Sequence, residues 1–147
     1  MRLDKTALCA LIPHHGSMCL LDAVESWDES GIACTSLSHL IENHPLRKHG
    51  KLHALTGIEY AAQAMAVHGA LVAGEVTPRP GYLAALREVT LSKQQLDDIS
   101  LALHIYATRL AGDTQHLLYA FKICAGSLDI LSGRAAVVLN PHDKRGE

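Results

Sequence analysis

The apolar stretch at residues 54–73 constrains the fold more than any other feature of the chain. It reads ALTGIEYAAQAMAVHGALVA, is rich in alanine, and is long enough for about five helical turns. Its residues give a helix almost no charged face, and a helix that is apolar nearly all round is expected to be buried on nearly all sides. The remainder of the chain must therefore wrap around this helix.

The ends of the predicted helix carry recognisable signals. Thr56 is expected as the N-cap, with Glu59 three residues later as its partner in a capping box. Gly74 is expected to end the helix, because glycine readily adopts the left-handed conformation found there.

Strands are predicted on both sides of the helix. Two precede it as a hairpin with a polar turn at 28–31, and three or four follow it, with turns at 111–114 and 126–128. The predicted strands are 18–27, 32–40, 82–92, 99–110, 115–125 and 129–139. One curved antiparallel sheet of five to six strands, wrapped around one long central helix, satisfies this order. We therefore expect an α+β protein with a single domain over residues 1–147.

Composition excludes several classes of protein. Hydrophobic residues make up 48% of the chain and charged residues 19%, as in a soluble globular domain, and a net charge of −2 is too weak to attract nucleic acid. His68, Gly69 and Gly74 interrupt the longest apolar run, so no membrane span is expected. Residues 1–11 lack the apolar core of a secretory signal, and the expected location is the cytoplasm.

The cysteines predict neither a metal site nor a redox site. They are widely spaced and contain no C-x-x-C pair, which argues against structural zinc: Cys9, Cys19, Cys34 and Cys124. Cys19 and Cys34 lie in apolar stretches, where free cysteine acts as a small hydrophobic residue.

Glu59 is the strongest chemical signal in the sequence. An unpaired carboxylate on an apolar helix would cost several kcal/mol, or the group would take up a proton. A protonated carboxyl in an apolar cleft is suited to general acid catalysis. Gln63, one turn further on, is placed to hydrogen-bond and orient Glu59. The alternative is that Glu59 only caps the helix with Thr56.

The polar segment 41–53 supplies candidate bases and a basic cluster. It is a long loop without periodicity, and such loops are often functional. A base working near neutral pH would most naturally be one of its histidines: His44, His49 or His53. Its basic residues Arg47, Lys48 and Lys51 could receive an acidic partner. His14 and His15, before the first strand, are expected to be structural.

Two stretches resemble the bacterial beta-hydroxyacyl-acyl carrier protein dehydratases. PHHGSMCLLDAV at 13–24 resembles their opening P-H-R-x-x-x-x-L-x-D-x-V segment, and GIEYAAQA at 57–64 resembles their helix motif E-x-x-A-Q. The resemblance implies a hotdog fold, with Glu59 as the catalytic carboxylate and Gln63 at the glutamine position. The family's G-H-F-P histidine segment is missing; His49 is the nearest equivalent, ten residues before Glu59. The chain is thus most similar to a divergent branch associated with polyketide-type pathways such as aryl polyene synthesis.

The resemblance implies a lyase that removes water from 3-hydroxyacyl thioesters, as in fatty acid biosynthesis. The substrate would be carried on the phosphopantetheine arm of acyl carrier protein, with no other cofactor and no metal. Glu59 and His49 would be catalytic, while Gly57 at the helix start and Gln63 would bind the substrate. The carrier protein would meet Arg47, Lys48 and Lys51. A homodimer, or a complex with a second hotdog subunit, would complete the site.

Two other functions stay open at this point. Hotdog thioesterases also place an acidic residue on the central helix, where it activates water. The second alternative is a dehydratase-like subunit that stabilises or completes a catalytic partner without being active alone.

Overall fold

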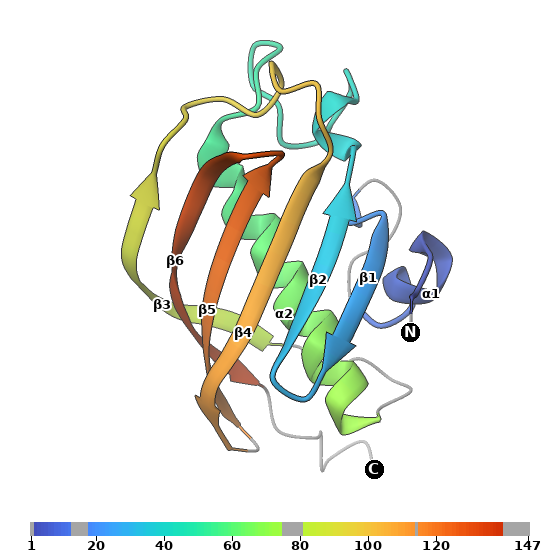
Figure 1. The fold of residues 1–147 in the computed structure, drawn as a ribbon, viewed down its shortest axis with the longest axis vertical. Helices are drawn as coiled ribbons and strands as arrows, with labels where there is room; N and C mark the ends of the chain where they lie inside the picture. Colours follow the sequence, from blue (N-terminus) through green and yellow to red (C-terminus); the bar gives the residue numbers. More distant parts are fainter. Residues whose placement is uncertain (1, 13–17, 75–80, 114, 140–147) are drawn as a thin grey trace.

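A computed structural model describes residues 2–12, 18–74, 81–113 and 115–139. These residues form one six-stranded antiparallel sheet that curves around a long helix (Figure 1). The chain order is α1 (Lys5–Cys9), β1 (Ala23–Asp28), β2 (Gly31–Ser36), the 3₁₀ turns Ser38–Leu40 and Ala54–Thr56, α2 (Gly57–Ala73), β3 (Gly81–Leu91), β4 (Leu103–Gly112), β5 (His116–Ala125) and β6 (Leu128–Leu139). The predicted hotdog arrangement is confirmed.

The strand order in the sheet is β1-β2-β4-β5-β6-β3. β1 and β2 form the predicted hairpin, with Asp28 paired to Gly31. β4, β5 and β6 follow one another as a meander, as expected. β3 does not join this meander next to β4; it crosses to the far edge of the sheet and pairs with β6, Gly81 opposite Leu139.

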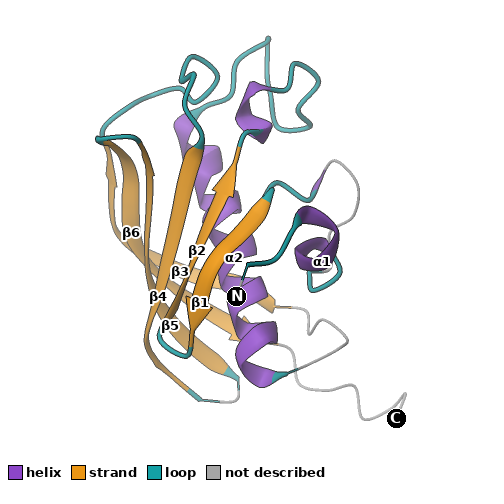
Figure 2. Cartoon of the chain, turned by 45° about the vertical axis from the view of Figure 1, so that its right-hand side comes forward, coloured by secondary structure: helices purple, strands orange, loops and turns teal. Residues whose placement is uncertain are grey.

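The central helix lies against the concave face of the sheet (Figure 2). It begins at Gly57, because residues 54–56 form a tighter 3₁₀ turn, and it ends at Gly74 in the left-handed conformation, as predicted. Its inward side chains, among them Tyr60, Ala64 and Val67, are buried against apolar residues of the sheet such as Ile105 and Ile123.

One edge of the sheet is left exposed. β3 is exposed along almost its whole length, and Tyr82 and Leu86 on it have 58% and 39% of their surface accessible. An apolar edge strand with unpaired backbone groups is a surface for pairing with another chain. The exposed edge thus supports the expectation of a partner subunit.

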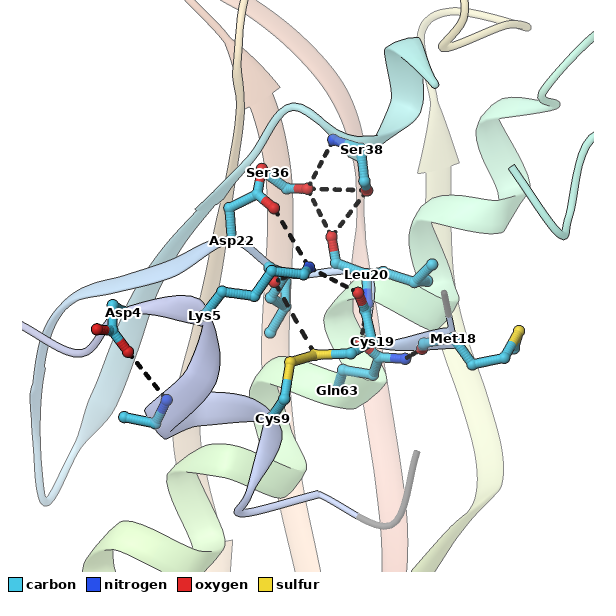
Figure 3. Close-up of a disulfide and its surroundings, with 12 residues drawn as sticks. Asp4, Lys5, Cys9, Met18, Cys19, Leu20, Asp22, Ser36, Ser38 and Gln63 are labelled. Atoms are coloured by element: carbon cyan, nitrogen blue, oxygen red, sulfur yellow. Dashed lines mark hydrogen bonds and ion pairs between the residues drawn. A yellow bond between two sulfur atoms is a disulfide. The ribbon is translucent and has the colours of Figure 1, made fainter. Parts of the chain in front are cut away.

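The N-terminal segment is anchored by a disulfide that the sequence did not predict. Cys9, at the end of α1, is bonded to Cys19 (Figure 3), so the expectation that Cys19 is free is wrong. The short helix is capped by Asp4, whose side chain accepts a hydrogen bond from the backbone N–H of Ala7 at 2.9 Å. Cys34 and Cys124 are free, as expected of Cys34.

Candidate active site

A cavity of about 360 Å³ runs along one face of α2. On the helix its lining includes Gln63, Met65, Ala70 and Val72, as well as Glu59 and a row of small residues spaced three and four apart, namely Ala62, Ala66, Gly69 and Ala73. Such spacing places side chains on one helix face. The residues of this row are half-buried or exposed, whereas those facing the sheet are buried. The small side chains therefore leave open space along the helix, and the prediction that α2 is buried on nearly all sides is only partly correct.

Glu59 lies at the N-terminal end of this stripe and is exposed. The protomer alone therefore does not bury the Glu59 carboxylate, contrary to the prediction. The predicted capping box is also wrong: Thr56 occupies the N-cap position, but its side chain makes no cap hydrogen bond. The Thr56 hydroxyl instead donates to the carbonyl of His53 at 2.6 Å. The Glu59 carboxylate is not engaged in capping the helix.

Gly57 has a packing role that the sequence reasoning did not foresee. A Cβ at this position would lie 2.8 Å from Ile123 Cδ1 and 2.9 Å from Leu131 Cδ2, so a larger residue would require the ends of these two side chains to shift where the helix start meets the sheet. Its N–H donates back to the carbonyls of Ala54 and Leu55 in the 3₁₀ turn. The N–H of Gly57, a residue expected to bind the substrate at the helix start, is therefore already engaged within the chain.

Gln63 lines the cavity but holds the N-terminal segment rather than Glu59. Its amide nitrogen donates to the carbonyl of Met18 at 2.6 Å, and its amide oxygen accepts from the N–H of Leu20 at 2.8 Å (Figure 3). Both polar ends of the amide are engaged, so the predicted orienting bond to Glu59 is replaced by two backbone bonds. A substrate-binding role for Gln63 stays a prediction.

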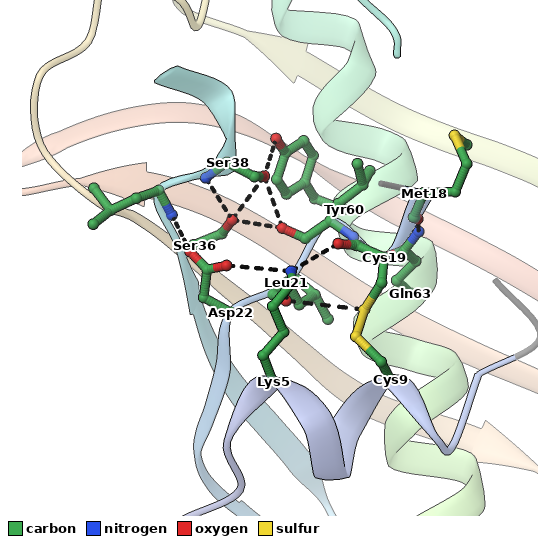
Figure 4. Close-up of polar contacts among 12 residues, drawn as sticks. Lys5, Cys9, Met18, Cys19, Leu21, Asp22, Ser36, Ser38, Tyr60 and Gln63 are labelled. Carbon is green, nitrogen blue, oxygen red and sulfur yellow. Dashed lines mark hydrogen bonds and ion pairs between the residues drawn. A yellow bond between two sulfur atoms is a disulfide. The ribbon is translucent and has the colours of Figure 1, made fainter. Parts of the chain in front are cut away.

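His44 is buried in a hydrogen-bond chain that nothing in the sequence indicated. Its Nε2 lies 3.0 Å from the Tyr60 hydroxyl, which lies 2.7 Å from Ser38 Oγ. Ser38 and Ser36 both donate to the carbonyl of Leu20 (Figure 3), and Figure 4 shows both serines beside Tyr60. Burial lowers the pKa of His44, helped by the nearby Arg47 charge. His44 therefore fixes the loop to the helix start as a neutral side chain.

The other two loop histidines have local roles in the chain. His49 has a φ of 54° and precedes Gly50 with a φ of 76°, in a tight turn closed by Lys48 and Lys51. His53 caps the 3₁₀ turn by accepting the N–H of Leu55 at 3.0 Å. Neither these histidines nor His44 line the cavity beside Glu59. The structure does not bring His49 and Glu59 together in that cavity, and the catalytic role of His49 stays a prediction.

The predicted basic cluster divides into two parts. Arg47 donates to the carbonyls of His39 and Gly50, both at 3.0 Å, so its guanidinium is committed to the loop. Lys48 and Lys51 are exposed at the turn and are free to meet an acidic surface. Carrier-protein binding by this segment stays a prediction, with the two lysines as its exposed part.

Arg109 is a charged cavity residue that was not among the predicted site residues. Arg109 lines the cavity from β4, on the same face of the strand as the buried residues Leu103, Ile105 and Ala107. The period of two along a strand places alternate residues on one face. An arginine that continues an apolar inward row is thus a signal that could have been found in the sequence.

Within the described ranges, no group of three or more His, Cys, Asp and Glu side chains could hold a metal ion. Among the same residues, no helix is long and apolar enough to cross a membrane. His14 and His15, and much of the segment resembling P-H-R, lie outside the described residues.

Comparison with known proteins places the chain among hotdog proteins. A family model described as ApeP-like, ApeP dehydratase, matches residues 6–145. The dehydratase heterocomplex ApeI:P from Xenorhabdus doucetiae contains a similar structure, with a TM-score of 0.82 at 19% identity, covering 94% of this chain and 93% of that one.

Thioesterases share the fold at a greater distance. A mutant thioesterase from Pseudomonas aeruginosa matches with a TM-score of 0.66 at 11% identity over 95% of both chains. A hypothetical thioesterase from Streptococcus pneumoniae, crystallised with coenzyme A, matches at 0.57 with 12% identity, over 80% of this chain and 84% of that one. No curated protein sequence matches.

Proposed function

The chain belongs to the ApeP-like dehydratase family, and from this premise we propose that it supplies Glu59 to the dehydration of a 3-hydroxyacyl thioester carried by acyl carrier protein. The observation that carries the proposal is the position of Glu59. It is the only acidic residue among the α2 side chains that line the cavity, and it is not used as a helix cap. The apolar stripe beyond it offers room for an acyl chain.

The proposed reaction needs one base and one acid. A histidine takes the proton from C2, and the electron pair of that C–H bond forms the C2–C3 double bond. The C3–O bond breaks as the Glu59 carboxyl donates a proton to the departing hydroxyl, which leaves as water. Atoms and charges balance, with the histidine protonated and Glu59 ionised at the end of the step. Proton exchange with water restores both groups.

The base in this proposal comes from a second hotdog subunit. No histidine of the described residues lines the cavity with Glu59, and β3, whose residues Gly81, Tyr82 and Leu83 line the same cavity, leaves an apolar sheet edge exposed. The relative from Xenorhabdus doucetiae is a heterocomplex, which supports a partner for this chain. A subunit paired along β3 would also cover Glu59 from water, which favours proton donation by a carboxyl group.

The exposed lysines of the 41–53 loop are the proposed contact for the carrier protein. Carrier proteins are acidic, and Lys48 and Lys51 project from a tight turn in the loop that leads into α2. The loop would then hold the carrier near the end of the cavity where Glu59 lies. The location proposed for such a reaction is the cytoplasm.

The test is Glu59→Gln, assayed with 3-hydroxyacyl thioesters on acyl carrier protein, with and without a co-purified hotdog subunit. Because the amide keeps the shape but cannot donate a carboxyl proton, the enoyl product should fall at least about a hundredfold. Glu29→Gln, in the exposed β1–β2 turn, is the matched control and should retain activity. Near-normal activity of Glu59→Gln would refute the proposal. Release of free thiol without enoyl product would establish a thioesterase instead.

His49→Gly separates a partner of the same sequence from a different one. Glycine adopts positive φ freely, so the turn is preserved and any loss reports the imidazole. If the chain is active without any other subunit, His49 of a second copy is the proposed base, and the variant should lose at least about a hundredfold. If activity requires a different hotdog subunit, the variant should be as active as the parent.

A further inference from the structure

The Cys9–Cys19 disulfide links two parts of the cavity wall. Leu11, two residues after Cys9, lines the cavity from the segment that follows α1. Cys19 lies between the two backbone groups that bond the Gln63 amide, and Gln63 lines the same cavity from α2 (Figure 3). The disulfide therefore ties the segment that carries Leu11 to the segment that Gln63 holds on the central helix.

The two linked segments are not held equally well. Cys19 stays on α2 through the two Gln63 bonds, of 2.6 and 2.8 Å, whether or not the disulfide is present. The backbone N–H of Leu11 instead donates to the carbonyl of Leu8 at 3.0 Å, within its own segment. Leu8 and Ile12 are buried in the core, but Leu11 between them is only half-buried. Loss of the disulfide should thus loosen Leu11 without detaching the segment.

The disulfide is placed for reduction by an external dithiol. Cys9 is half-buried, whereas Cys19 is only 3% exposed, so an attacking thiolate reaches Cys9 first and Cys19 leaves as a thiolate. The Lys5 ammonium lies 2.8 Å from the Leu21 carbonyl oxygen, and the Cys19 sulfur lies 4.0 Å from the same oxygen (Figure 4). A positive charge this close stabilises the departing thiolate.

The location proposed for the chain also bears on the role of the disulfide. Thiol reductants keep most cysteines of the cytoplasm reduced, and the disulfides found there are usually catalytic or redox-sensing. Neither Cys9 nor Cys19 is among the residues that line the cavity with Glu59, so a catalytic role has no support. The position of the bond beside two parts of the cavity wall favours a sensing role.

We infer that the Cys9–Cys19 disulfide is a redox switch of the cavity: the oxidised chain holds Leu11 in the cavity wall, and a cellular dithiol releases Leu11 and weakens the binding of an apolar ligand. One thiolate of the dithiol forms a mixed disulfide with Cys9, and its second thiolate then displaces Cys9. The dithiol gives up two electrons and two protons and becomes a disulfide, while both cysteines become thiols. The inference rests on the proposed function for the acyl ligand and the cytoplasmic location, and it adds redox control of that site.

Binding of octanoyl pantetheine to the full chain tests the inference without requiring turnover. Calorimetry compares the oxidised chain with the chain reduced by dithiothreitol, each first shown to be folded by thermal unfolding. Reduction should weaken binding at least about threefold, because one leucine of the wall is no longer held against the ligand. Equal binding by both forms, or tighter binding by the reduced form, would overturn the inference.

Two leucine variants test whether Leu11 transmits the effect. Leu11→Ala should bind octanoyl pantetheine more weakly than the parent when oxidised, and reduction should weaken it little further. Leu37→Ala, at a leucine that is 51% exposed and outside the cavity lining, should respond to reduction like the parent. A Leu11→Ala chain that keeps the full response would overturn the role assigned to Leu11.

Cysteine variants test whether this disulfide is the one that responds. The double variant Cys9→Ser/Cys19→Ser should bind octanoyl pantetheine as the reduced parent does, with or without dithiothreitol. Cys34→Ser, at a free cysteine, should keep the response of the parent. A double variant whose binding still changes with dithiothreitol would overturn the inference.

Amide hydrogen exchange separates the switch from the proposed ligand. Reduction should speed exchange at the N–H of Leu11 but not at the N–H of Leu20, which Gln63 still holds. If exchange changes in this way while octanoyl pantetheine binds neither form, the proposed acyl ligand fails and the release of Leu11 stands. Unchanged exchange at Leu11 would overturn the switch.

Discussion

His44 Nε2 lies 3.0 Å from the hydroxyl of Tyr60, the residue that follows Glu59 in α2. His44 Nδ1 accepts the N–H of Leu46 at 3.0 Å, so Nε2 carries the proton of the neutral ring and donates to Tyr60. The Tyr60 hydroxyl then donates to Ser38 Oγ. The 41–53 loop is thereby fixed to the turn of helix that presents Glu59.

Tyr60→Phe should destabilise the protein by about 1–3 kcal/mol, because it leaves the buried His44 ring and Ser38 hydroxyl without a shared partner. The measurement is the free energy of unfolding in urea. Tyr82→Phe is the matched control, since Tyr82 is 58% exposed, and it should change the stability little. If both variants unfold at the same urea concentration as the parent, the hydrogen-bond chain contributes nothing to stability.

Stability should fall as the pH drops below 6.5, because His39, His44 and His68 have their pKa lowered, first of all by burial. A lowered folded-state pKa means that the unfolded chain binds protons more readily. The stabilisation is therefore present above pH 6.5, the ordinary pKa of histidine, and is lost as the pH falls towards the lower pKa of the folded state. Urea unfolding at pH 7.5, 6.5 and 5.5 would measure the loss.

A matched pair of variants tests whether His68 contributes to this pH dependence of stability. His68→Gln should lose stability at pH 7.5 but show a shallower decline towards pH 5.5, because one buried ring no longer titrates. His116→Gln, at an exposed histidine, should leave the decline as steep as in the parent. Equal slopes in all three proteins would exclude His68 as a contributor.

Reducing the Cys9–Cys19 disulfide should destabilise the protein by about 2–3 kcal/mol, the size expected when a short loop of the unfolded chain is released. Thermal unfolding with and without a reductant measures this. The double variant Cys9→Ser/Cys19→Ser should match the reduced parent and should not respond to the reductant. Cys34→Ser, at a free cysteine, should retain the response to reductant. An unchanged midpoint for the reduced parent would contradict the prediction.

Much of the architecture could be predicted because it depends on local pattern. The alanine-rich stretch, the glycine at 74 and the polar turn at 28–31 gave the helix, its end and the hairpin. The placement of β3 at the far edge could not be predicted, because which strands pair depends on contacts distant in sequence. The disulfide was missed for the same reason, since widely spaced cysteines do not reveal their pairing.

The site was predicted less completely than the fold. The position of Glu59 on the central helix followed from the sequence, and the structure places it in a cavity. The partners of Gln63 and Gly57 did not follow, because their hydrogen bonds and packing involve Met18, Leu20 and Ile123. Gly57 and Gln63, which belong to the motif that resembles a catalytic one, thus contribute to the packing around the helix.

The protein should be a dimer or larger assembly that pairs along β3. The strand is exposed along almost its full length, with apolar side chains that a single protomer leaves in water. Sedimentation at low micromolar concentration should therefore give at least twice the 15.8 kDa protomer mass, either with a second copy or with a co-expressed hotdog subunit.

Leu86→Lys on β3 should weaken this assembly and lower dehydration, because it places a charge in the interface and uncovers Glu59. Leu128→Lys, at a similarly exposed leucine that begins β6, should do neither. A single species at the protomer mass, with and without the second subunit, would contradict the pairing and the proposed source of the base together.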